Sequence, residues 1–324
     1  MYKHCLFLIL FFSTFSQIYT FMTPSVKGYH PEKNTCLYTI KNLEHVIPFD
    51  NIYTNYYYVP SNENQSSEIA LLLIHGFGAN HHHWRSNIPS LSQKYDTYAI
   101  DLFGFGNSSQ FTEFPYTVSF WSSQVVDFIE NVIKRPCIVV GNSLGGYISM
   151  NSATKTSNII GLILINPAIL SKNNPLIIFD SQWYYSKFFV QSYFYYLKNK
   201  KVIKYFLEQL YPVFPDRIND FLLDSLYYSA CNKNASEIFY KILTENIIKP
   251  SIFIEDILPN ISVPMLFING EKDVWIHPNS TVEKIKNASK VEFINVVAGH
   301  CPQDEIPEMI NELVLNFTEK VMFL

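Results

Sequence analysis

The sequence predicts an α/β fold in which a mostly parallel central sheet carries helices on both faces and a helical cap is inserted between two strands. Short apolar runs alternate with amphipathic segments through the first half of the chain, as expected of repeated strand–helix–strand units. This alternation breaks at about residues 171–250, where aromatic, helix-compatible segments replace it. Nine of the eleven glycines fall in five short places, most of them after predicted strands. Glycine permits close backbone approach, so these places mark a site at the strand ends.

The predicted strands of the first half are short and strongly apolar. Residues 69–74 form a continuous apolar run that ends at His75, which is typical of a buried parallel strand. Residues 120–133 repeat apolar side chains every three to four positions, which predicts an amphipathic helix. Residues 84–91 show helical spacing as well. Further strands are predicted at residues 55–59, 95–100, 137–140 and 159–165.

The second half contains the cap and the return of the sheet. We place the helical cap at residues 171–250, because 20 aromatic residues lie between Ser171 and Phe253, a larger share than in the whole chain. Packing of the cap on the core explains this density, and an apolar tunnel for an acyl chain is the alternative. The sheet resumes with strands at 263–270 and 291–297, and a last helix follows at 306–317. The core then comprises residues 46–170 and 251–324.

The N-terminus has the pattern of a targeting segment. In residues 1–22, Lys3 and His4 precede a short apolar run, which predicts a signal peptide, with an uncleaved anchor as the alternative. Residues 23–45 lack periodicity and are interpreted as a leader or transit-like segment. We therefore expect entry into the secretory pathway, with an anchored form in the endoplasmic reticulum or secretion as alternatives.

Ser143 is the predicted nucleophile. It stands in Gly141-Asn142-Ser143-Leu144-Gly145, between an apolar strand and a helix-compatible segment, which is the setting of a nucleophile elbow. In such a turn the hydroxyl is held exposed, and a plain tight turn is the alternative interpretation. Because parallel strands end at one edge of a sheet, His75, Asp101 and Ser143 are expected to converge there.

A serine hydroxyl needs a base, and the base needs an orienting acid. His300 is the predicted base, because it follows the last predicted strand in a turn that contains Gly299. Asp273 is the predicted acid, since it follows the preceding strand and its carboxylate can accept the second imidazole N–H. Glu271 is the neighbouring competitor and is otherwise a solvated loop charge.

Two backbone amides, those of Phe77 and Leu144, are predicted to bind the oxyanion that forms when the serine attacks. The chemistry requires no cofactor, and none is predicted. The run His81-His82-His83 has no carboxylate or cysteine at ligand spacing, so it predicts the start of a helix near the site and no metal. Asp304 and Glu305 stand just before the last helix, where capping and interaction with the helix dipole explain them.

These motifs resemble those of the α/β-hydrolase superfamily. The resemblance covers about residues 46–324 and is weakest across the cap. Within the superfamily, residues 141–147 and 299–308 look most like the pheophytinase-like group of plants, algae and cyanobacteria. At the position of Gln303, plant members more often carry histidine, and this departure weakens the transfer of an exact substrate. Together with the leader, the resemblance implies onward delivery to a plastid-type organelle, such as an apicoplast.

The resemblance implies an α/β-hydrolase fold and a serine triad. In it Ser143 is the nucleophile, Asp273 the acid and His300 the base, and the oxyanion hole is formed by the amides of Phe77 and Leu144. The related epoxide hydrolases and haloalkane dehalogenases use an aspartate nucleophile, which is not the residue found at position 143.

The predicted function is hydrolysis of a carboxylic ester with a hydrophobic, lipid-like or aromatic substrate. Acyl transfer and C–C bond hydrolysis use the same triad and are alternatives within enzymology. A binding or scaffold protein that keeps the fold without turnover is the non-enzyme alternative. The formal net charge of −4 and the lack of a basic stripe give no reason to expect a nucleic acid partner. The expected partners are a small hydrophobic ester and a membrane surface, and the sequence leaves the oligomeric state open.

Overall fold

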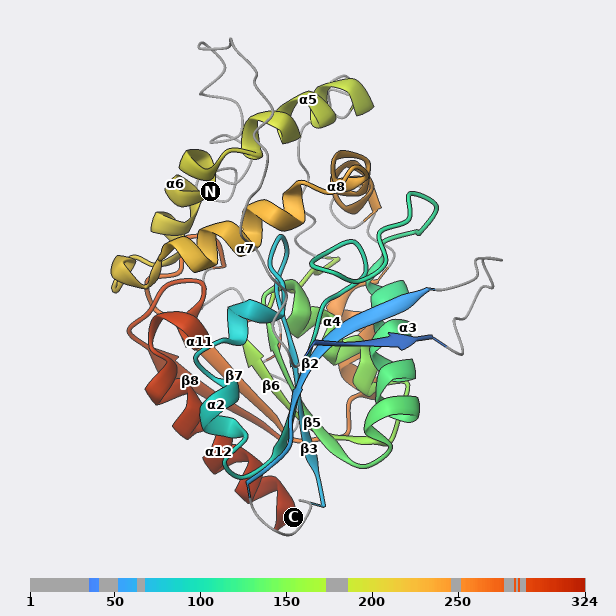
Figure 1. Cartoon of the computed structure of the whole chain (residues 1–324). Helices are drawn as coiled ribbons and strands as arrows, with labels where there is room; N and C mark the ends of the chain where they lie inside the picture. The colour runs from blue at the N-terminus through green and yellow to red at the C-terminus, as the bar shows by residue number, and fades with distance from the viewer. Residues whose placement is uncertain are drawn as a thin grey trace.

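The computed structural model describes residues 35–40, 52–62, 68–172, 186–245, 252–276, 283, 285 and 290–323. The predicted signal peptide at residues 1–22 lies outside these residues, as does most of the predicted leader at 23–45. Figure 1 shows a twisted sheet with helices on both faces and a group of helices above one end of it. No helix in the described part of the chain is both long and apolar enough to cross a membrane.

The central sheet has eight strands in the order β1-β2-β4-β3-β5-β6-β7-β8. β1 pairs antiparallel with β2 and β2 antiparallel with β4, and all other neighbours are parallel. The predicted mostly parallel sheet is thus confirmed. The strands are β1 (Thr35–Thr39), β2 (Tyr53–Val59), β3 (Ala70–Ile74), β4 (Asp96–Ile100), β5 (Cys137–Asn142), β6 (Ile159–Ile165), β7 (Met265–Gly270) and β8 (Val291–Val296).

The first strand, β1, was not predicted. It lies before residue 46, where the sequence placed the start of the core, and every residue of it pairs with β2. As an edge strand it is half-exposed, and Leu37 points an apolar side chain to solvent with 65% of its surface accessible. Its three apolar residues, Cys36, Leu37 and Tyr38, are consecutive and do not alternate with polar ones, so the sequence offered no strand periodicity to detect.

Helices cover both faces of the sheet, as predicted. Successive residues of a strand point to opposite faces, so Leu72 of β3 packs in one apolar cluster and Leu71 and Leu73 in another. The first cluster includes α3 (Val118–Phe128) and α4 (Leu144–Ala153), and the second includes α2 (Ile88–Leu91) and α12 (Pro307–Met322). A π-helical turn, η2 (Ile129–Ile133), extends α3 up to Lys134.

The helix predicted at residues 84–91 is instead two short pieces. These are the 3₁₀ helix η1 (His81–Trp84) and the single turn α2. Pro89 stands in the first turn of α2, where its missing N–H and its clash with the preceding turn do not matter. In the interior of a longer helix the same proline would break a hydrogen bond, so the chain starts a new helix instead.

The cap is helical and inserted between β6 and β7, as predicted. It consists of α5 (Lys187–Leu197), α6 (Lys200–Leu210), the 3₁₀ turn η4 (Pro215–Arg217), α7 (Asp220–Ala230) and α8 (Ala235–Leu243). Asn199 and Asn219 cap α6 and α7 through side-chain oxygens that accept backbone N–H groups. After the cap, α9 (Ile254–Ile257) and η6 (Leu258–Asn260) lead back to β7, and α11 (Pro302–Glu305) precedes α12. Residues 173–185 and 246–250 of the predicted cap lie outside the described residues.

Candidate active site

Ser143 occupies a strained turn between β5 and α4. Its backbone has φ 54° and ψ −118°, a conformation that non-glycine residues rarely adopt. A side chain at Gly141 would come within 2.5 Å of the carbonyl oxygen of Gly145, and one at Gly145 would overlap the main chain of Ile74 in β3. The strand, the turn and the helix therefore approach one another closely, and the two glycines make this possible. This is the local structure that the serine motif predicted.

Asp273 and His300 meet at the ends of β7 and β8. The imidazole Nδ1 of His300 lies 2.7 Å from Oδ2 of Asp273. The other carboxylate oxygen, Oδ1, accepts the backbone N–H groups of Trp275 at 2.8 Å and Ile276 at 3.0 Å. Both side chains of the pair are buried. A carboxylate only accepts hydrogen bonds, so it holds the proton of His300 on Nδ1 and keeps Nε2 as the basic nitrogen.

The competing carboxylate, Glu271, is exposed, whereas Asp273 is 6% exposed and directed at the imidazole. The ring of Trp275 lies beside His300 with the ring centroids 5.6 Å apart. Of the two carboxylates in this loop, the structure therefore brings Asp273 to His300.

Two asparagines whose role the sequence did not reveal hold the His300 loop, one to the serine turn and one to the end of β7. The Asn142 amide, one residue before Ser143, donates to the carbonyl of His300 at 3.1 Å. The Asn166 amide donates to the carbonyl of Gly299 at 2.9 Å, while its oxygen accepts the N–H of Gly270 at 2.8 Å. In the sequence, each of these asparagines is a polar residue at the end of an otherwise apolar strand, and this position was the signal that could have identified them.

The loop after β3 lies against Ser143. A side chain at Gly76 would place its Cβ 3.1 Å from the Cβ of Ser143, so Phe77 follows directly after this close approach. Leu144 is the first residue of α4, and the first N–H groups of a helix have no partner within the helix. The two amides predicted for an oxyanion hole therefore belong to segments that lie beside Ser143.

His75 joins the loop after β3 to the loop after β4. Its Nε2 accepts the N–H of Leu102 at 3.0 Å, so its proton is on Nδ1, which donates to the carbonyl of Gly76 at 2.7 Å. Complete burial lowers the pKa of His75 to about 4. The ring is therefore neutral at physiological pH and acts as a fixed connector.

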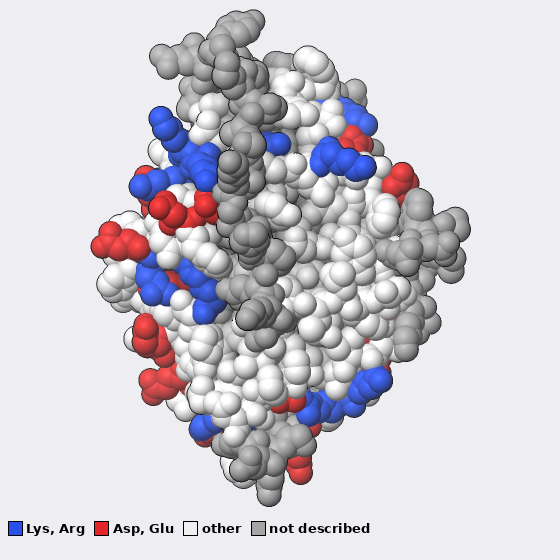
Figure 2. Space-filling model, viewed as in Figure 1, with Lys and Arg blue, Asp and Glu red and all other residues white. Residues whose placement is uncertain are grey.

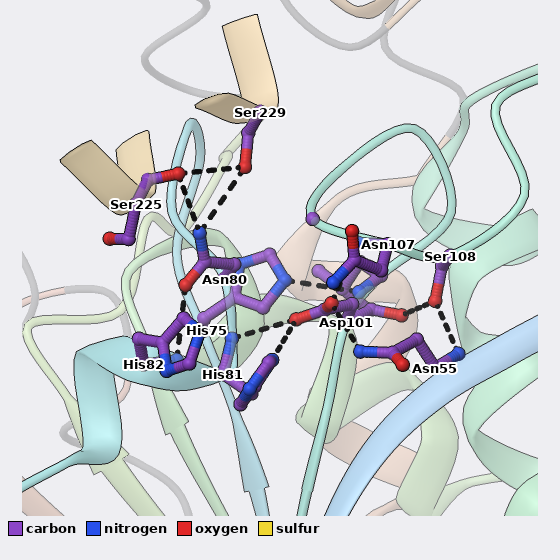
Figure 3. A network of polar contacts seen from close by, with 12 residues as sticks. Asn55, His75, Asn80, His81, His82, Asp101, Asn107, Ser108, Ser225 and Ser229 are labelled. Atoms are coloured by element: carbon purple, nitrogen blue, oxygen red, sulfur yellow. Dashed lines mark hydrogen bonds and ion pairs between the residues drawn. The ribbon is translucent and has the colours of Figure 1, made fainter. Parts of the chain in front are cut away.

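Asp101 lies at the centre of a buried polar network (Figure 3). Its Oδ1 accepts the backbone N–H of His81 at 2.7 Å and contacts the ring Nδ1 of His81 at 2.9 Å. Its Oδ2 accepts the Asn55 amide and the Asn107 N–H, both at 2.8 Å. Burial would raise the pKa of Asp101, but the His81 ring and these hydrogen bonds outweigh it and hold the pKa well below its usual range. Asp101 thus links η1 to β2 and to the loop after β4, and its convergence with Ser143 stays a prediction.

The histidine run at 81–83 fastens η1 to its surroundings. His82 packs edge-on against Phe221 of α7, and the His83 Nε2 lies 2.8 Å from the hydroxyl of Tyr211. Burial lowers the pKa of both His82 and His83 to about 3, so both are neutral. Within the described residues, no group of three or more histidine, cysteine, aspartate or glutamate side chains is arranged to hold a metal.

Asp304 and Glu305 are not the helix caps that the sequence predicted. Neither α11 nor α12 has a side-chain capping hydrogen bond, and both carboxylates are buried. Asp304 accepts hydrogen bonds from Arg85 and Tyr211, and Glu305 accepts from backbone amides of the cap. The sequence showed two acidic residues before a helix but could not show that the cap folds back over them.

Comparison with known proteins finds similar chains along most of the sequence. The model of the alpha/beta hydrolase family matches residues 71–313. The uncharacterized hydrolase YugF of Bacillus subtilis is 26% identical over 272 residues, which cover 82% of this chain and 94% of that protein. The chloroplastic pheophytinase of Arabidopsis thaliana is 23% identical, with coverage of 76% of this chain and 60% of that protein.

A solved structure shares the fold. The crystal structure of a membrane phospholipase A, a bacterial virulence factor, aligns with a TM-score of 0.69 at 23% identity and covers 89% of this chain and 87% of that one. The family model spans most of the chain, including the serine turn and the His300 loop. The protein therefore belongs to the alpha/beta hydrolase family.

Proposed function

We propose that the protein is a serine-dependent hydrolase of carboxylic esters. The observation that carries the proposal is the 2.7 Å contact between Asp273 and His300, held by Asn142 against the strained turn of Ser143. An acid that orients a histidine toward a serine hydroxyl is the arrangement that activates a serine for attack on an acyl carbon.

In this mechanism the Ser143 hydroxyl attacks the ester carbonyl while His300 Nε2 takes its proton. Asp273 stabilises the imidazolium through the Nδ1 hydrogen bond. The amides of Phe77 and Leu144 donate to the oxyanion, and one such donor contributes on the order of 3 kcal/mol to barrier lowering. His300 then protonates the leaving alkoxide. Water, deprotonated by the same nitrogen, hydrolyses the acyl-serine and restores the hydroxyl.

Aromatic contacts support a hydrophobic substrate. The ring of Phe77 packs against Phe105 and against Phe239 of α8, with centroids 5.8 and 5.9 Å apart. Phe239 in turn packs against Phe194 of α5 at 5.2 Å. Aromatic surface thus continues from the proposed oxyanion loop into the cap, where it favours a lipid-like or aromatic group.

We expect a fluorophosphonate probe to label the wild-type protein and to leave Ser143→Ala unlabelled, because the probe reacts only with an activated serine. Ser149→Ala is the matched control, since that serine lies six residues further on, in α4, and is fully buried. It should be labelled as the wild type is.

On p-nitrophenyl esters, the wild-type rate should rise from acetate to longer acyl chains. Equal labelling of wild type and Ser143→Ala would refute the nucleophile, and a strict preference for acetate would refute the lipid-like substrate.

We further propose that the cap contacts a membrane surface. α5 and α6 expose aromatic side chains, with Phe188 83% accessible and Tyr195 and Tyr205 each 52%. The segment 187–210 contains five lysines and one acidic residue, although the whole chain is net negative. Figure 2 shows Lys and Arg side chains gathered around α6. Exposed aromatic rings beside lysines favour the interface of an anionic bilayer. The predicted secretory and plastid targeting stays a prediction from residues 1–45.

Vesicle sedimentation tests this surface. We expect the protein to bind vesicles of phosphatidylcholine with phosphatidylserine more tightly than phosphatidylcholine alone. A double reversal, Lys201→Glu with Lys204→Glu, should weaken binding at least about tenfold, since each surface lysine contributes about 1 kcal/mol. Lys94→Glu with Lys320→Glu is the control, because these lysines pair with Glu319 and Glu292 away from the cap. Equal loss in both double variants would reject the cap as the docking surface.

A further inference from the structure

Two adjacent carboxylates, Asp304 and Glu305, are buried beside His300 although the proposed reaction uses neither. They form the end of α11 and are 0% and 2% exposed. Burying a carboxylate is costly unless hydrogen bonds and charges compensate it. Their partners therefore indicate what these two residues hold together.

Glu305 bridges the histidine loop and the cap. Its Oε2 accepts the N–H of Gly299, the residue before His300, at 2.5 Å. Its Oε1 accepts the N–H groups of Val213 and Phe214, at 2.7 and 2.9 Å, in the segment that joins α6 to η4. One carboxylate thus binds both sides at once, and each of its oxygens serves a different side.

The cap also touches the histidine main chain directly. The N–H of His300 donates to the carbonyl of Leu210, at the end of α6, at 3.0 Å. A side chain at Gly299 would overlap this same carbonyl, so only glycine lets the cap come so close. The position of the cap and that of the His300 backbone are therefore linked over a few ångströms.

The Asp304 side chain binds the same cap, and among the described residues its carboxylate accepts no hydrogen bond from the histidine loop. It accepts from Arg85 at 2.8 Å and from the hydroxyl of Tyr211 at 2.9 Å, and Arg217 lies 3.6 Å from its other oxygen. The Arg217 Nε also donates to the Asp304 carbonyl at 2.7 Å. Asp304 thus fastens the cap to the core. It is a carboxylate as deeply buried as Glu305, so it is a matched comparison for Glu305.

We propose that Glu305 is a positioning residue that couples the placement of His300 to the position of the cap, an inference that rests on the proposed function. By holding the Gly299 N–H, Glu305 fixes the main chain from which the imidazole projects. By holding the Val213 and Phe214 amides with the same carboxylate, it makes that placement depend on the cap being seated. A displaced cap then moves the base away from Ser143, so a substrate that orders the cap also orders the base.

The variant Glu305→Gln tests this coupling. A glutamine has one accepting oxygen, so its NH₂ group must face either the Gly299 N–H or the two cap amides. For p-nitrophenyl acetate, which is too small to need the cap, we expect kcat to fall about 10- to 100-fold with KM changed less than about threefold, because a small misplacement of a catalytic group has an effect of this size. The fold decrease in kcat caused by Asp304→Asn should be at least ten times smaller than the decrease caused by Glu305→Gln. Similar losses in both variants would overturn the proposal.

An NMR measurement tests the coupling between Glu305 and His300 independently of the proposed function. The Nδ1 proton of His300, assigned by its loss in His300→Gln, is observable by NMR whether or not the protein turns over an ester. We expect Glu305→Gln to shift or broaden this resonance and to speed amide exchange at residues 210–214, whereas Asp304→Asn should leave the resonance in place. An unchanged resonance in Glu305→Gln would show a merely structural role.

If the wild type shows neither labelling nor turnover, the proposed function is wrong. The NMR comparison still tests the coupling in that case. If Glu305→Gln does not fold, Glu305→Asp provides the same comparison, since it keeps the charge but is one methylene too short to reach both sides. We expect the aspartate variant to move the His300 resonance in the same direction, and an unmoved resonance in a folded Glu305→Asp would overturn the coupling.

Discussion

Replacing Asp273 by asparagine is expected to lower kcat for ester hydrolysis about 10⁴-fold while leaving the fold intact. The reason lies in the two oxygens of this carboxylate. Oδ1 accepts the N–H groups of Trp275 and Ile276, so the amide oxygen of an asparagine must take that place. The NH₂ group then points at Nδ1 of His300, 2.7 Å away in the wild type. Nδ1 must become the acceptor, which moves the imidazole proton to Nε2 and removes the base.

Glu271→Gln is the matched control, because Glu271 is the other carboxylate of the loop and is exposed. It should keep kcat within about threefold of the wild type, as expected for a solvated charge without a partner at the site. Initial rates on a p-nitrophenyl ester and circular dichroism of each variant give the comparison. A large loss of kcat in Glu271→Gln together with a small loss in Asp273→Asn would show that Glu271, and not Asp273, is the acid.

The buried strands and the serine turn could be predicted because their causes are local. A buried parallel strand needs a run of apolar side chains, and a tight strand-to-helix turn needs glycine on either side of Ser143. Asp273 and His300 were predicted from their places after strands, since the topology of a parallel sheet brings strand ends together. The structure confirms the sheet and places these two side chains in contact.

What the sequence could not supply are the contacts between distant segments. Asn142 reaches a carbonyl 158 residues away, and Glu305 reaches cap amides more than 90 residues before it. A single asparagine or glutamate has no periodicity, so such a partner becomes visible only in three dimensions. Glu305 was therefore interpreted from its neighbours along the chain, as a residue that caps the last helix. Its contact with the inserted helical cap is visible only in the structure.

The network around Asp101 leads to the largest expected change in stability. Asp101 is fully buried and its two oxygens each face two nitrogen atoms, so both positions require an acceptor. Asp101→Asn turns one oxygen into a donor that must face either the His81 nitrogens or the Asn55 and Asn107 donors. Removing one partner of a buried charged network typically costs about 3–5 kcal/mol, which corresponds to a fall in Tm of roughly 10 °C for a domain of this size.

The same substitution at the surface, Asp224→Asn, is the control for this prediction. Asp224 forms an exposed ion pair with Lys200, and its loss should shift Tm by no more than about 2 °C. The pH dependence gives a second reading with a defined sign. Because the folded pKa of Asp101 is lowered, its stabilisation is fully present above about pH 4, the unfolded value.

This stabilisation is lost as pH falls further and the carboxylate takes up a proton. The difference in the free energy of unfolding between wild type and Asp101→Asn should therefore be full at pH 7 and shrink below pH 4, as measured by denaturant titration. A difference that stayed constant down to the lowest pH at which the protein folds would mean that the charge of Asp101 contributes nothing. The network would then hold its loops by shape alone, and an uncharged acceptor of the same size could replace the carboxylate.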